Sequence, residues 1–299
     1  MGPAAAEVDA GLAVPGARRT GGPIGESVDT GSRAWGIMAG VSAGATAPSP
    51  LALSLRQGGF RGHLAVEEPL DRHTTWRIGG PAELLARPAD RDDVFLLVEW
   101  ADRSGVPWRV LGNGSNLLVA DAGVRGLVLR LKKTLDWMDV DGTRLFAGGG
   151  ASFPAVANVA ATRGLAGLEF AAGIPGTVGG AVVMNAGWHE HETGNVISSV
   201  EMLDGDGERR TVARDRCGFG YRDSVFKDQG VIILSATFVL RPSTPEAVRG
   251  EMDGYTASRR VHQPTALPSS GSGYLKPPGD YAGRLIDAAA LKGQRVGDI

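Results

Sequence analysis

The sequence predicts a fold that mixes α-helices with short β-strands, preceded by a tail without regular structure. Apolar residues recur at helical spacing within residues 90–104, which indicates one face of a helix. Between residues 106 and 240, short apolar runs alternate with turns rich in Gly, Asn and Asp, which is typical of strands joined by tight connections. Residues 1–61 are rich in Gly, Ala, Ser and Pro without a sustained period, so we expect a disordered extension there.

Local signals set the individual elements. Asp90 can cap the start of the helix at residues 90–104, and Gly105 can end it. Asp141-Gly142 predicts a hairpin between two strands. Further helices are expected at residues 153–163, 245–260 and 281–291. In chain order, the predicted strands cover residues 83–88, 106–111, 126–131, 135–140, 144–148, 196–203, 208–212 and 231–240.

The composition is that of an ordinary globular protein with an excess of glycine. The formal charge of −2 over 299 residues gives no reason to expect a nucleic acid or an anionic membrane as partner. No apolar run is long enough to span a bilayer. The single cysteine, Cys217, excludes an internal disulfide and fits a reducing compartment. We therefore expect a cytoplasmic protein. We also expect a monomer, although no feature of the sequence determines the oligomeric state.

Two glycine-rich segments are candidate ligand sites. Residues 167–187 contain six glycines in an apolar stretch, and glycine lets a backbone approach a flat ligand because no Cβ intervenes. Residues 112–116 combine two glycines with Asn and Ser, a composition suited to binding an anion through backbone N–H groups. This loop is neither a Rossmann fingerprint nor a P-loop. From the residues alone, tight turns in a β-rich core explain both segments equally well.

Two other features offer weaker functional signals. Residues 189–192 read His-Glu-His-Glu, but His189 and His191 lack the i, i+4 spacing of a zinc-binding helix. We expect a polar loop there and no metal site. Cys217 has no evident base nearby, so we expect a small buried hydrophobic residue rather than a nucleophile.

Five separated motifs occur in order between residue 75 and residue 283. They are Thr75-Trp76-Arg77-Ile78-Gly79-Gly80, Gly112-Asn113-Gly114-Ser115-Asn116, residues 173–187, Gly220-Tyr221-Arg222-Asp223-Ser224, and residues 268–283. Together they resemble the flavin-dependent UDP-N-acetylenolpyruvoylglucosamine reductases of peptidoglycan synthesis, often called MurB. Each motif is weak by itself, whereas five in the same order are specific.

The resemblance implies an FAD-binding region at residues 62–243, made of two α+β subdomains of the vanillyl-alcohol-oxidase-like (PCMH) type. A C-terminal α+β substrate domain would begin at residue 244. The family continues past the last predicted helix with further strands and a glutamate that pairs with the serine and arginine of the site. No residue of this chain matches that glutamate, so we expect the domain at residues 244–299 to be incomplete.

The resemblance also implies the cofactor contacts. The FAD pyrophosphate would lie in the loop formed by Gly112, Asn113, Gly114, Ser115 and Asn116. Residues Arg77, Ile78, Gly79 and Gly80 would complete the cofactor bed. The flavin would lie along the second segment, with contacts from Gly173, Ile174, Pro175, Gly176, Gly179, Gly180, Asn185, Ala186 and Gly187.

The implied reaction reduces an enolpyruvyl ether to a lactyl ether, with NADPH as hydride donor to FAD. Arg222 is the candidate cation, because a guanidinium stays charged and can bind a carboxylate through two parallel hydrogen bonds. Ser272 is the candidate proton donor, since a serine can protonate a far more basic carbanion. Tyr221 and Lys227 are candidate contacts to the UDP-sugar phosphate or the nicotinamide. The family usually has a Lys-Asn pair after this serine, and this chain has Leu275-Lys276 instead. A substrate contact made by that pair in the family is therefore not expected to be the same here.

Three hypotheses remain open at this point. The chain is a reductase of this family, or a flavoprotein of the same fold that acts on another substrate, or a non-catalytic FAD-binding remnant. FAD content and reduction by NADPH distinguish the first two from the third. Turnover of the enolpyruvyl sugar distinguishes the first from the second.

Overall fold

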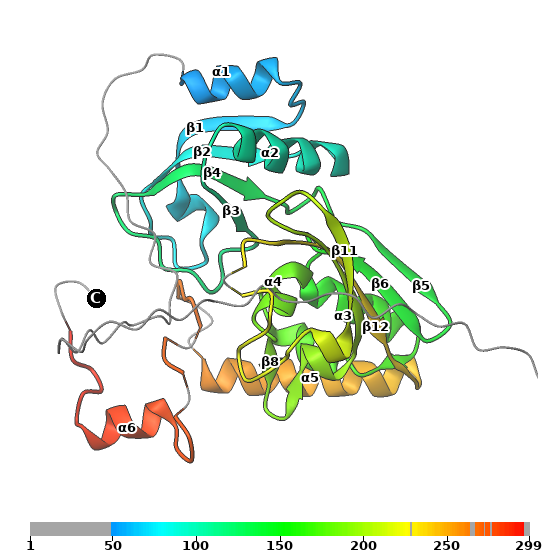
Figure 1. Ribbon diagram of the computed structural model, residues 1–299. Coiled ribbons are helices and arrows are strands. Elements are labelled where there is room, and N and C mark those ends of the chain that lie inside the picture. The colour runs from blue at the N-terminus through cyan, green and yellow to red at the C-terminus, as the bar shows by residue number, and fades with distance from the viewer. Residues whose placement is uncertain (1–48, 228, 264–266, 272, 276, 296–299) are drawn as a thin grey trace, which may run out of the picture. The chain divides into compact units, whose positions relative to one another are not determined.

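The computed structural model describes residues 49–295 except positions 228, 264–266, 272 and 276 (Figure 1). All of them belong to one compact unit, Trp35–Ile299. Helix α1 (Pro50–Gln57) corrects the predicted disordered extension over residues 1–61. Its Leu55 is fully buried, and Trp100 Nε1 donates a 3.2 Å hydrogen bond to Ser54 Oγ. The prediction was wrong here because the apolar face of α1 finds a tertiary partner. Residues 1–48 lie outside the described part of the chain.

The first subdomain contains a four-stranded sheet in the order β1-β2-β4-β3. Strand β1 (His63–Pro69) runs antiparallel to β2 (Pro81–Arg87). Strands β4 (Val124–Arg130) and β3 (Trp108–Leu111) continue the sheet in parallel with β2. The short helix η1 (Leu70–His73) follows β1, and helix α2 (Arg91–Arg103) connects β2 to β3.

The second subdomain contains a five-stranded antiparallel sheet in the order β11-β10-β12-β6-β5. These strands are β5 (Met138–Asp141), β6 (Arg144–Gly148), β10 (Ile197–Leu203), β11 (Arg209–Ala213) and β12 (Ile232–Val239). Its helices are α3 (Phe153–Thr162), η2 (Glu169–Gly173), α4 (Val178–Val183), η3 (Thr193–Asn195) and η4 (Arg214–Arg216). Two short pairs complete it: β7 (Leu165–Ala166) with β13 (Arg241–Pro242), and β8 (Gly187–Trp188) with β9 (His191–Glu192).

A shared hydrophobic core connects the two sheets. Leu203, Ile232 and Leu234 of the second sheet pack into the cluster that α1 and α2 form with the first sheet. An ion pair of 2.7 Å between Arg91 and Glu201 adds a polar contact between α2 and β10. The two sheets therefore share one packed cluster and one ion pair.

Helix α5 (Pro245–His262) packs on the second subdomain, beside α3 (Figure 1). Its Val248 and Met252 are 2% and 7% exposed and belong to that core. This packing differs from the predicted domain boundary at residue 244, because the apolar stripe of the helix is buried against the preceding domain. Helix α6 (Ala282–Ala288) follows later in the chain.

Most predicted elements are present, and the fold confirms the predicted α+β class. Asp90 caps α2 as expected, since its side chain accepts a 3.0 Å hydrogen bond from the Asp93 backbone N–H. Helix α4 was not expected, because Gly179 and Gly180 are poor helix formers. Strand β1 was also not expected.

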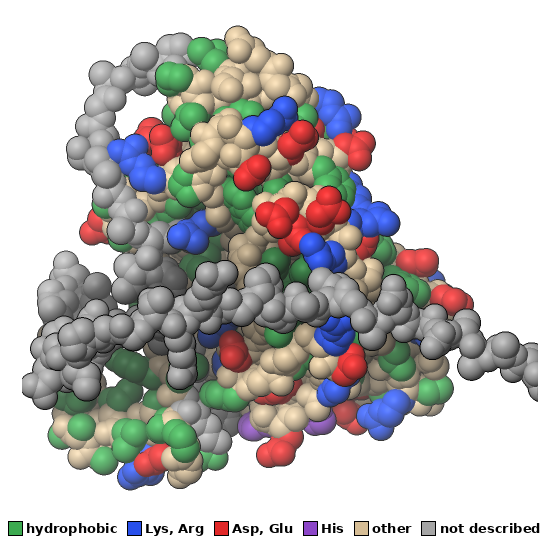
Figure 2. Space-filling model, in the orientation of Figure 1, with side chains coloured by type: hydrophobic (Ala, Val, Ile, Leu, Met, Phe, Trp, Pro, Cys, Tyr) green, Lys and Arg blue, Asp and Glu red, His purple; other side chains and the backbone are tan. Residues whose placement is uncertain are grey.

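Charged side chains of both signs lie on the surface. Figure 2 shows acidic and basic side chains interspersed over the visible face. Within the described ranges, no helix combines the length and the apolar character needed to cross a bilayer.

Candidate active site

The loop at residues 112–116 is held closely against two neighbouring segments. It follows β3, and Gly114 has a left-handed φ of 63°. A Cβ on Gly114 would lie 2.2 Å from the His73 carbonyl oxygen, and one on Gly112 would lie 2.6 Å from Thr177 Oγ1. The Thr75 N–H donates a 3.1 Å hydrogen bond to the Gly114 carbonyl. Only glycine fits these two positions.

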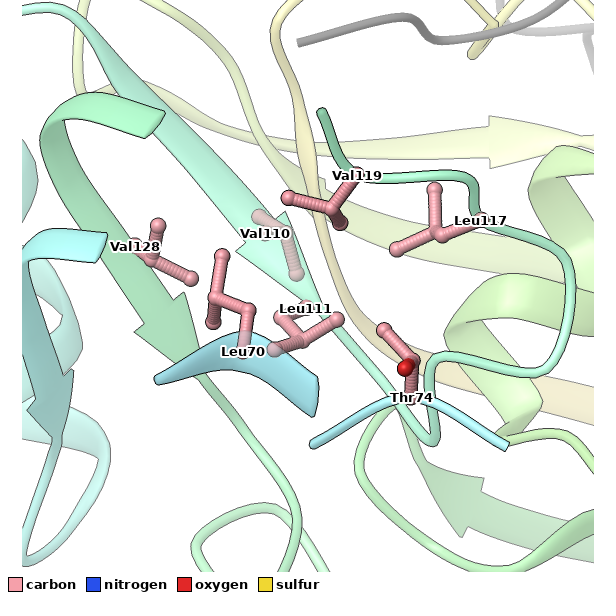
Figure 3. Close-up of a pocket in the computed structure, with 7 residues that line it drawn as sticks. All are labelled: Leu70, Thr74, Val110, Leu111, Leu117, Val119 and Val128. Atoms are coloured by element: carbon pink, nitrogen blue, oxygen red, sulfur yellow. The ribbon is translucent and has the colours of Figure 1, made fainter. Parts of the chain in front are cut away.

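A layer of apolar side chains packs beside this loop. Leucine and valine side chains from η1, β3, β4 and the strand-like segment after the loop converge on a small space (Figure 3). They are Leu70, Val110, Leu111, Leu117, Val119 and Val128, with Thr74 at the edge. The cavity has a volume of about 10 Å³ for the centre of a water-sized sphere, at the lower limit for one water molecule. It is therefore part of the packing beneath the loop and does not accommodate a cofactor.

The second glycine-rich segment divides into a turn and a short helix. The Phe153 N–H donates to the Gly176 carbonyl at 3.0 Å, which fixes the turn. Thr177 Oγ1 then accepts a 3.3 Å hydrogen bond from the Gly180 N–H and caps α4. A Cβ on Gly179 would lie 3.0 Å from the Gly149 carbonyl oxygen, so this glycine permits close packing of α4 on the sheet.

The two glycine-rich segments meet in space although about sixty residues separate them. The Ser115 hydroxyl lies 4.0 Å from the position of a Cβ on Gly176, and Gly112 lies against Thr177. The predicted bed residues 77–80 contact Thr74 and the stretch that follows the loop. The Gly80 N–H donates to the Ala120 carbonyl at 3.0 Å, and the Ile78 carbonyl accepts from Thr74 Oγ1 at 2.9 Å.

The loop at residues 112–116 fits an anionic group. Among the described residues, the backbone N–H groups of residues 113–116 donate to no carbonyl or side chain. The buried Asn113 Oδ1 has no hydrogen-bond partner there either, but it is an acceptor and does not contribute to binding an anion. Free N–H groups around a left-handed glycine form a concave site for an oxyanion such as a pyrophosphate. The geometry of this loop therefore suits the phosphate part of FAD.

A polar cluster stands at the other end of the second segment. The buried Asn185, with φ 40°, donates through Nδ2 to Glu192 Oε2 at 2.7 Å and to the Gly220 carbonyl at 2.9 Å. Asn185 Oδ1 accepts from the Gly194 N–H at 2.8 Å. The side chain thus fixes β9, η3 and the segment before Arg222 in one place.

Arg222 extends from that segment towards the backbone of the glycine-rich stretch. Its Nη2 donates a 2.8 Å hydrogen bond to the Gly187 carbonyl, and its Nη1 lies 3.4 Å from the Asn185 carbonyl. Nη1 also lies 3.5 Å from Glu192 Oε1, and the side chain is 29% exposed. The guanidinium is therefore held in position and remains accessible from solvent.

The remaining predicted substrate residues lie beside Arg222. Arg222 stacks over the ring of Tyr221 at 5.0 Å from its centre. Lys227 forms an ion pair of 3.6 Å with Asp223. Ser224 Oγ donates to the Val183 carbonyl at 2.8 Å and so attaches this segment to the end of α4.

Comparisons with known proteins agree with this geometry. Residues 82–213 match the family described as FAD binding domain, and residues 263–299 match the C-terminal domain of UDP-N-acetylenolpyruvoylglucosamine reductase. The reductase of Moorella thermoacetica is 46% identical over 243 residues, which is 81% of this chain and 79% of that protein. UDP-N-acetylenolpyruvoylglucosamine reductase 2 of Symbiobacterium thermophilum is 45% identical over 79% of this chain and 77% of its own length.

The chain belongs to the UDP-N-acetylenolpyruvoylglucosamine reductase family. The crystal structure of a reductase of this family from Thermus caldophilus superposes with a TM-score of 0.68 at 37% identity, covering 80% of this chain and 83% of that one. The family predicted from the five motifs is thereby confirmed, as is its FAD-binding α+β fold.

Within this reductase fold, the structure brings some of the predicted site residues together and does not describe others. Of the predicted cofactor residues, Gly112 and Ser115 lie against Thr177 and Gly176 of the second segment, and Arg222 contacts that segment at Asn185 and Gly187. Ser272, the candidate proton donor, lies outside the described residues, as does Lys276. The described residues before it contact the site, because the Ser269 N–H donates to the Thr75 carbonyl at 3.2 Å.

Two residues of this site were not found by sequence reasoning. Thr75 contacts Gly114 and Ser269, and it stood in the first motif without an assigned role. Glu192 faces Arg222, and it stood in the His-Glu-His-Glu segment, where a polar loop was expected but Glu192 itself was given no role. In that segment, His191 stacks on Phe170 at 6.2 Å between ring centres. Among the described residues, no group of three or more His, Cys, Asp or Glu is arranged to hold a metal ion.

Cys217 has the predicted character of a buried hydrophobic residue. Its side chain is fully buried and free of any disulfide. Burial raises the pKa of the thiol to about 11, so the thiolate is not available at neutral pH.

Proposed function

We propose that this chain catalyses the NADPH-linked, FAD-dependent reduction of UDP-N-acetylglucosamine enolpyruvate to UDP-N-acetylmuramate, a step of peptidoglycan precursor synthesis. The observation that carries the proposal is the position of Arg222, whose guanidinium is fixed by Gly187, Asn185 and Glu192 at the end of a glycine-lined segment. The family of the chain supports the same reaction.

The residues that would hold FAD are those of the two glycine-rich segments and the bed at residues 77–80. The N–H groups of residues 113–116, which have no partner among the described residues, would bind the pyrophosphate, and residues 173–187 would lie along the flavin. When bound, FAD supplies two-electron hydride transfer from NADPH to the carbon–carbon double bond of the substrate.

Arg222 would bind the carboxylate of the enolpyruvyl group. Hydride addition to the carbon of the double bond that does not carry the carboxylate builds negative charge on the neighbouring carbon and on the carboxylate attached to it. A fixed guanidinium stabilises this charge more in the transition state than in the ground state, which lowers the barrier. The long contacts of Nη1, at 3.4 and 3.5 Å, are weak enough to be exchanged for a carboxylate oxygen. The 2.8 Å hydrogen bond from Nη2 to the Gly187 carbonyl would keep the guanidinium oriented during this exchange.

Ser272 would donate the proton that completes the reduction. Protonation must occur at the carbon next to the one that receives hydride, and a hydroxyl can protonate a carbanion that is far more basic. Tyr221, which is 52% exposed, and Lys227 would contact the UDP part of the substrate. We place the reaction in the cytoplasm, in keeping with the lone, free Cys217, and we expect a monomer.

An anaerobic stopped-flow experiment tests the function. FAD-loaded protein is mixed first with NADPH and then with UDP-N-acetylenolpyruvoylglucosamine, while the flavin absorbance is followed. We expect the absorbance to bleach and then to recover on addition of the sugar. Bleaching without recovery would contradict the proposed substrate assignment, and the chain would then be a flavoprotein that acts on another substrate. A protein that takes up no FAD would contradict the proposal entirely.

A further inference from the structure

Helix α5 presents one continuous stripe to the segment that precedes the Gly173–Gly176 turn. Val248, Met252, Tyr255 and Arg259 are spaced by four, three and four residues, so they share one face of the helix. Val248 and Met252 are buried hydrophobic residues, and Tyr255 packs edge-on against His191 at 6.1 Å between ring centres. Arg259 occupies the next position of this stripe.

Arg259 lies beside the glycine-rich turn. Its Cδ is 3.5 Å from the position that a Cβ on Gly173 would take, and its side chain is half-buried. Its Nε donates a 2.8 Å hydrogen bond to Gln263 Oε1, while the Gln263 N–H donates to the Arg259 carbonyl at 2.9 Å. Gln263 therefore ends the helix and fixes the plane of the guanidinium.

Arg259 differs from the other cations of the site in its partners. Arg222 lies 3.5 Å from a Glu192 oxygen, and Lys227 lies 3.6 Å from an Asp223 oxygen. In the part of the chain that the structure describes, no carboxylate forms an ion pair with Arg259. The carboxylate of Glu169 on η2 is already engaged, because it accepts from the Gly167 N–H at 2.8 and 2.9 Å.

A half-buried charge without a counter-charge has a desolvation cost that a ligand can offset. Burial lowers the pKa of Arg259, yet a guanidinium remains charged at neutral pH. Its two terminal nitrogens have no partner among the described residues, and together they form the fork that matches two oxygens of a phosphate. The turn beside Arg259 leads to Gly176, which lies near Ser115 of the loop at residues 112–116.

We propose that Arg259 binds a phosphate oxygen of a nucleoside diphosphate group in this site, and that it sets the affinity for that nucleotide rather than the rate of chemistry. The inference rests on the proposed function, which brings two such groups to the site. These are the pyrophosphate of FAD and the diphosphate of the UDP-sugar.

The test compares Arg259→Met with Arg260→Met, since both remove one positive charge from adjacent positions of α5 and Arg260 is exposed. FAD affinity of the apoprotein is measured by flavin fluorescence quenching, and UDP affinity of the FAD-loaded protein by calorimetry. Loss of a charge-assisted hydrogen bond should weaken one of these affinities about 10- to 100-fold in Arg259→Met. Arg260→Met should change either affinity by less than about 2-fold, because solvent screens an exposed charge.

A second variant guards against misfolding of the first. Gln263→Glu keeps Arg259 but gives it a carboxylate partner. It should therefore lower the affinity for the same nucleotide whose binding Arg259→Met weakens. The thermal unfolding of the apoprotein is recorded for each variant. A merely structural Arg259 would lower the unfolding temperature of the apoprotein in Arg259→Met, whereas our proposal expects no decrease.

The two arms identify the source of the phosphate. Weaker FAD binding assigns Arg259 to the cofactor, and weaker UDP binding assigns it to the substrate. Unchanged affinity for both, or an equal loss in Arg260→Met, would overturn the proposal. A wild-type protein that binds FAD and UDP but does not reduce the enolpyruvyl sugar would overturn the proposed function alone.

Discussion

Thr75 and Ser269 are joined by a reciprocal pair of hydrogen bonds across 194 residues of sequence. Thr75 Oγ1 donates to the Ser269 carbonyl at 2.6 Å, and the Ser269 N–H donates to the Thr75 carbonyl at 3.2 Å. The Thr75 N–H also donates to the Gly114 carbonyl at 3.1 Å. Thr75 therefore connects the loop that suits the cofactor phosphate with the segment that leads to the candidate proton donor.

Thr75→Val should slow the half-reaction in which the sugar is reduced. The change leaves the Ser269 carbonyl without its side-chain donor, and an unsatisfied partly buried carbonyl costs about 1–3 kcal/mol. We expect flavin reoxidation by the enolpyruvyl sugar to slow about 10-fold, while flavin reduction by NADPH is unchanged. Stopped-flow measurement of the two half-reactions checks this.

The controls separate this contact from a general loss of stability. Thr75→Ser keeps the hydroxyl and should restore the wild-type rate. Thr134→Val removes a comparable bond, of 2.7 Å to the Pro88 carbonyl, at a distant position. Slow reoxidation in Thr134→Val, or unaltered reoxidation in Thr75→Val, would contradict the role of Thr75.

Arg222→Lys should lower kcat/KM for the enolpyruvyl sugar by about 10²- to 10³-fold, because an ammonium cannot reproduce the planar fork that binds the carboxylate. Reduction of the flavin by NADPH should be retained. Arg214→Lys is the matched control, since Arg214 also donates to a backbone carbonyl, that of Gly194, at 2.7 Å, but is exposed. Similar losses in both variants would argue against a catalytic Arg222.

Gly114→Ala should weaken both FAD binding and folding. The new Cβ would lie 2.2 Å from the His73 carbonyl oxygen at a φ of 63°. We expect a loss of about 3 kcal/mol in the free energy of unfolding. Gly142→Ala shares the positive φ, 56°, but meets no atom within 4 Å, so it should lose only about 1–2 kcal/mol. Urea unfolding of the two apoproteins checks the difference, and equal losses would contradict the close packing of the loop.

Local signals were sufficient for elements whose residues determine their own structure. Helix α2 was predictable because Asp90 caps it and its apolar spacing is regular. Helix α4 was not, since Gly179 and Gly180 oppose a helix and only the Thr177 cap and the packing against Gly149 stabilise it. The packing against Gly149 is a tertiary contact, so local helix propensity does not predict it.

The site shows the same division between local and distant contacts. The loop at residues 112–116 and Arg222 could be found from motifs, because their chemistry lies in a few adjacent residues. The opposition of Glu192 and Arg222 depends on the fold that brings β9 next to the segment after Gly220. No spacing in the sequence indicates that pairing.

Cys217 should make the stability of the fold decrease in alkaline solution. Burial, with a smaller effect of Asp215, raises the pKa of the thiol from 9.0 to about 11. Below pH 9.0 the thiol is protonated in the folded and the unfolded chain, so its contribution does not vary with pH. Between pH 9.0 and about 11 only the unfolded thiol ionises, which favours unfolding by up to about 2 kcal/mol. Urea titrations across this range should therefore show a shallower decline for Cys217→Ala than for the wild type, and parallel declines would mean that the thiol ionises equally in both states.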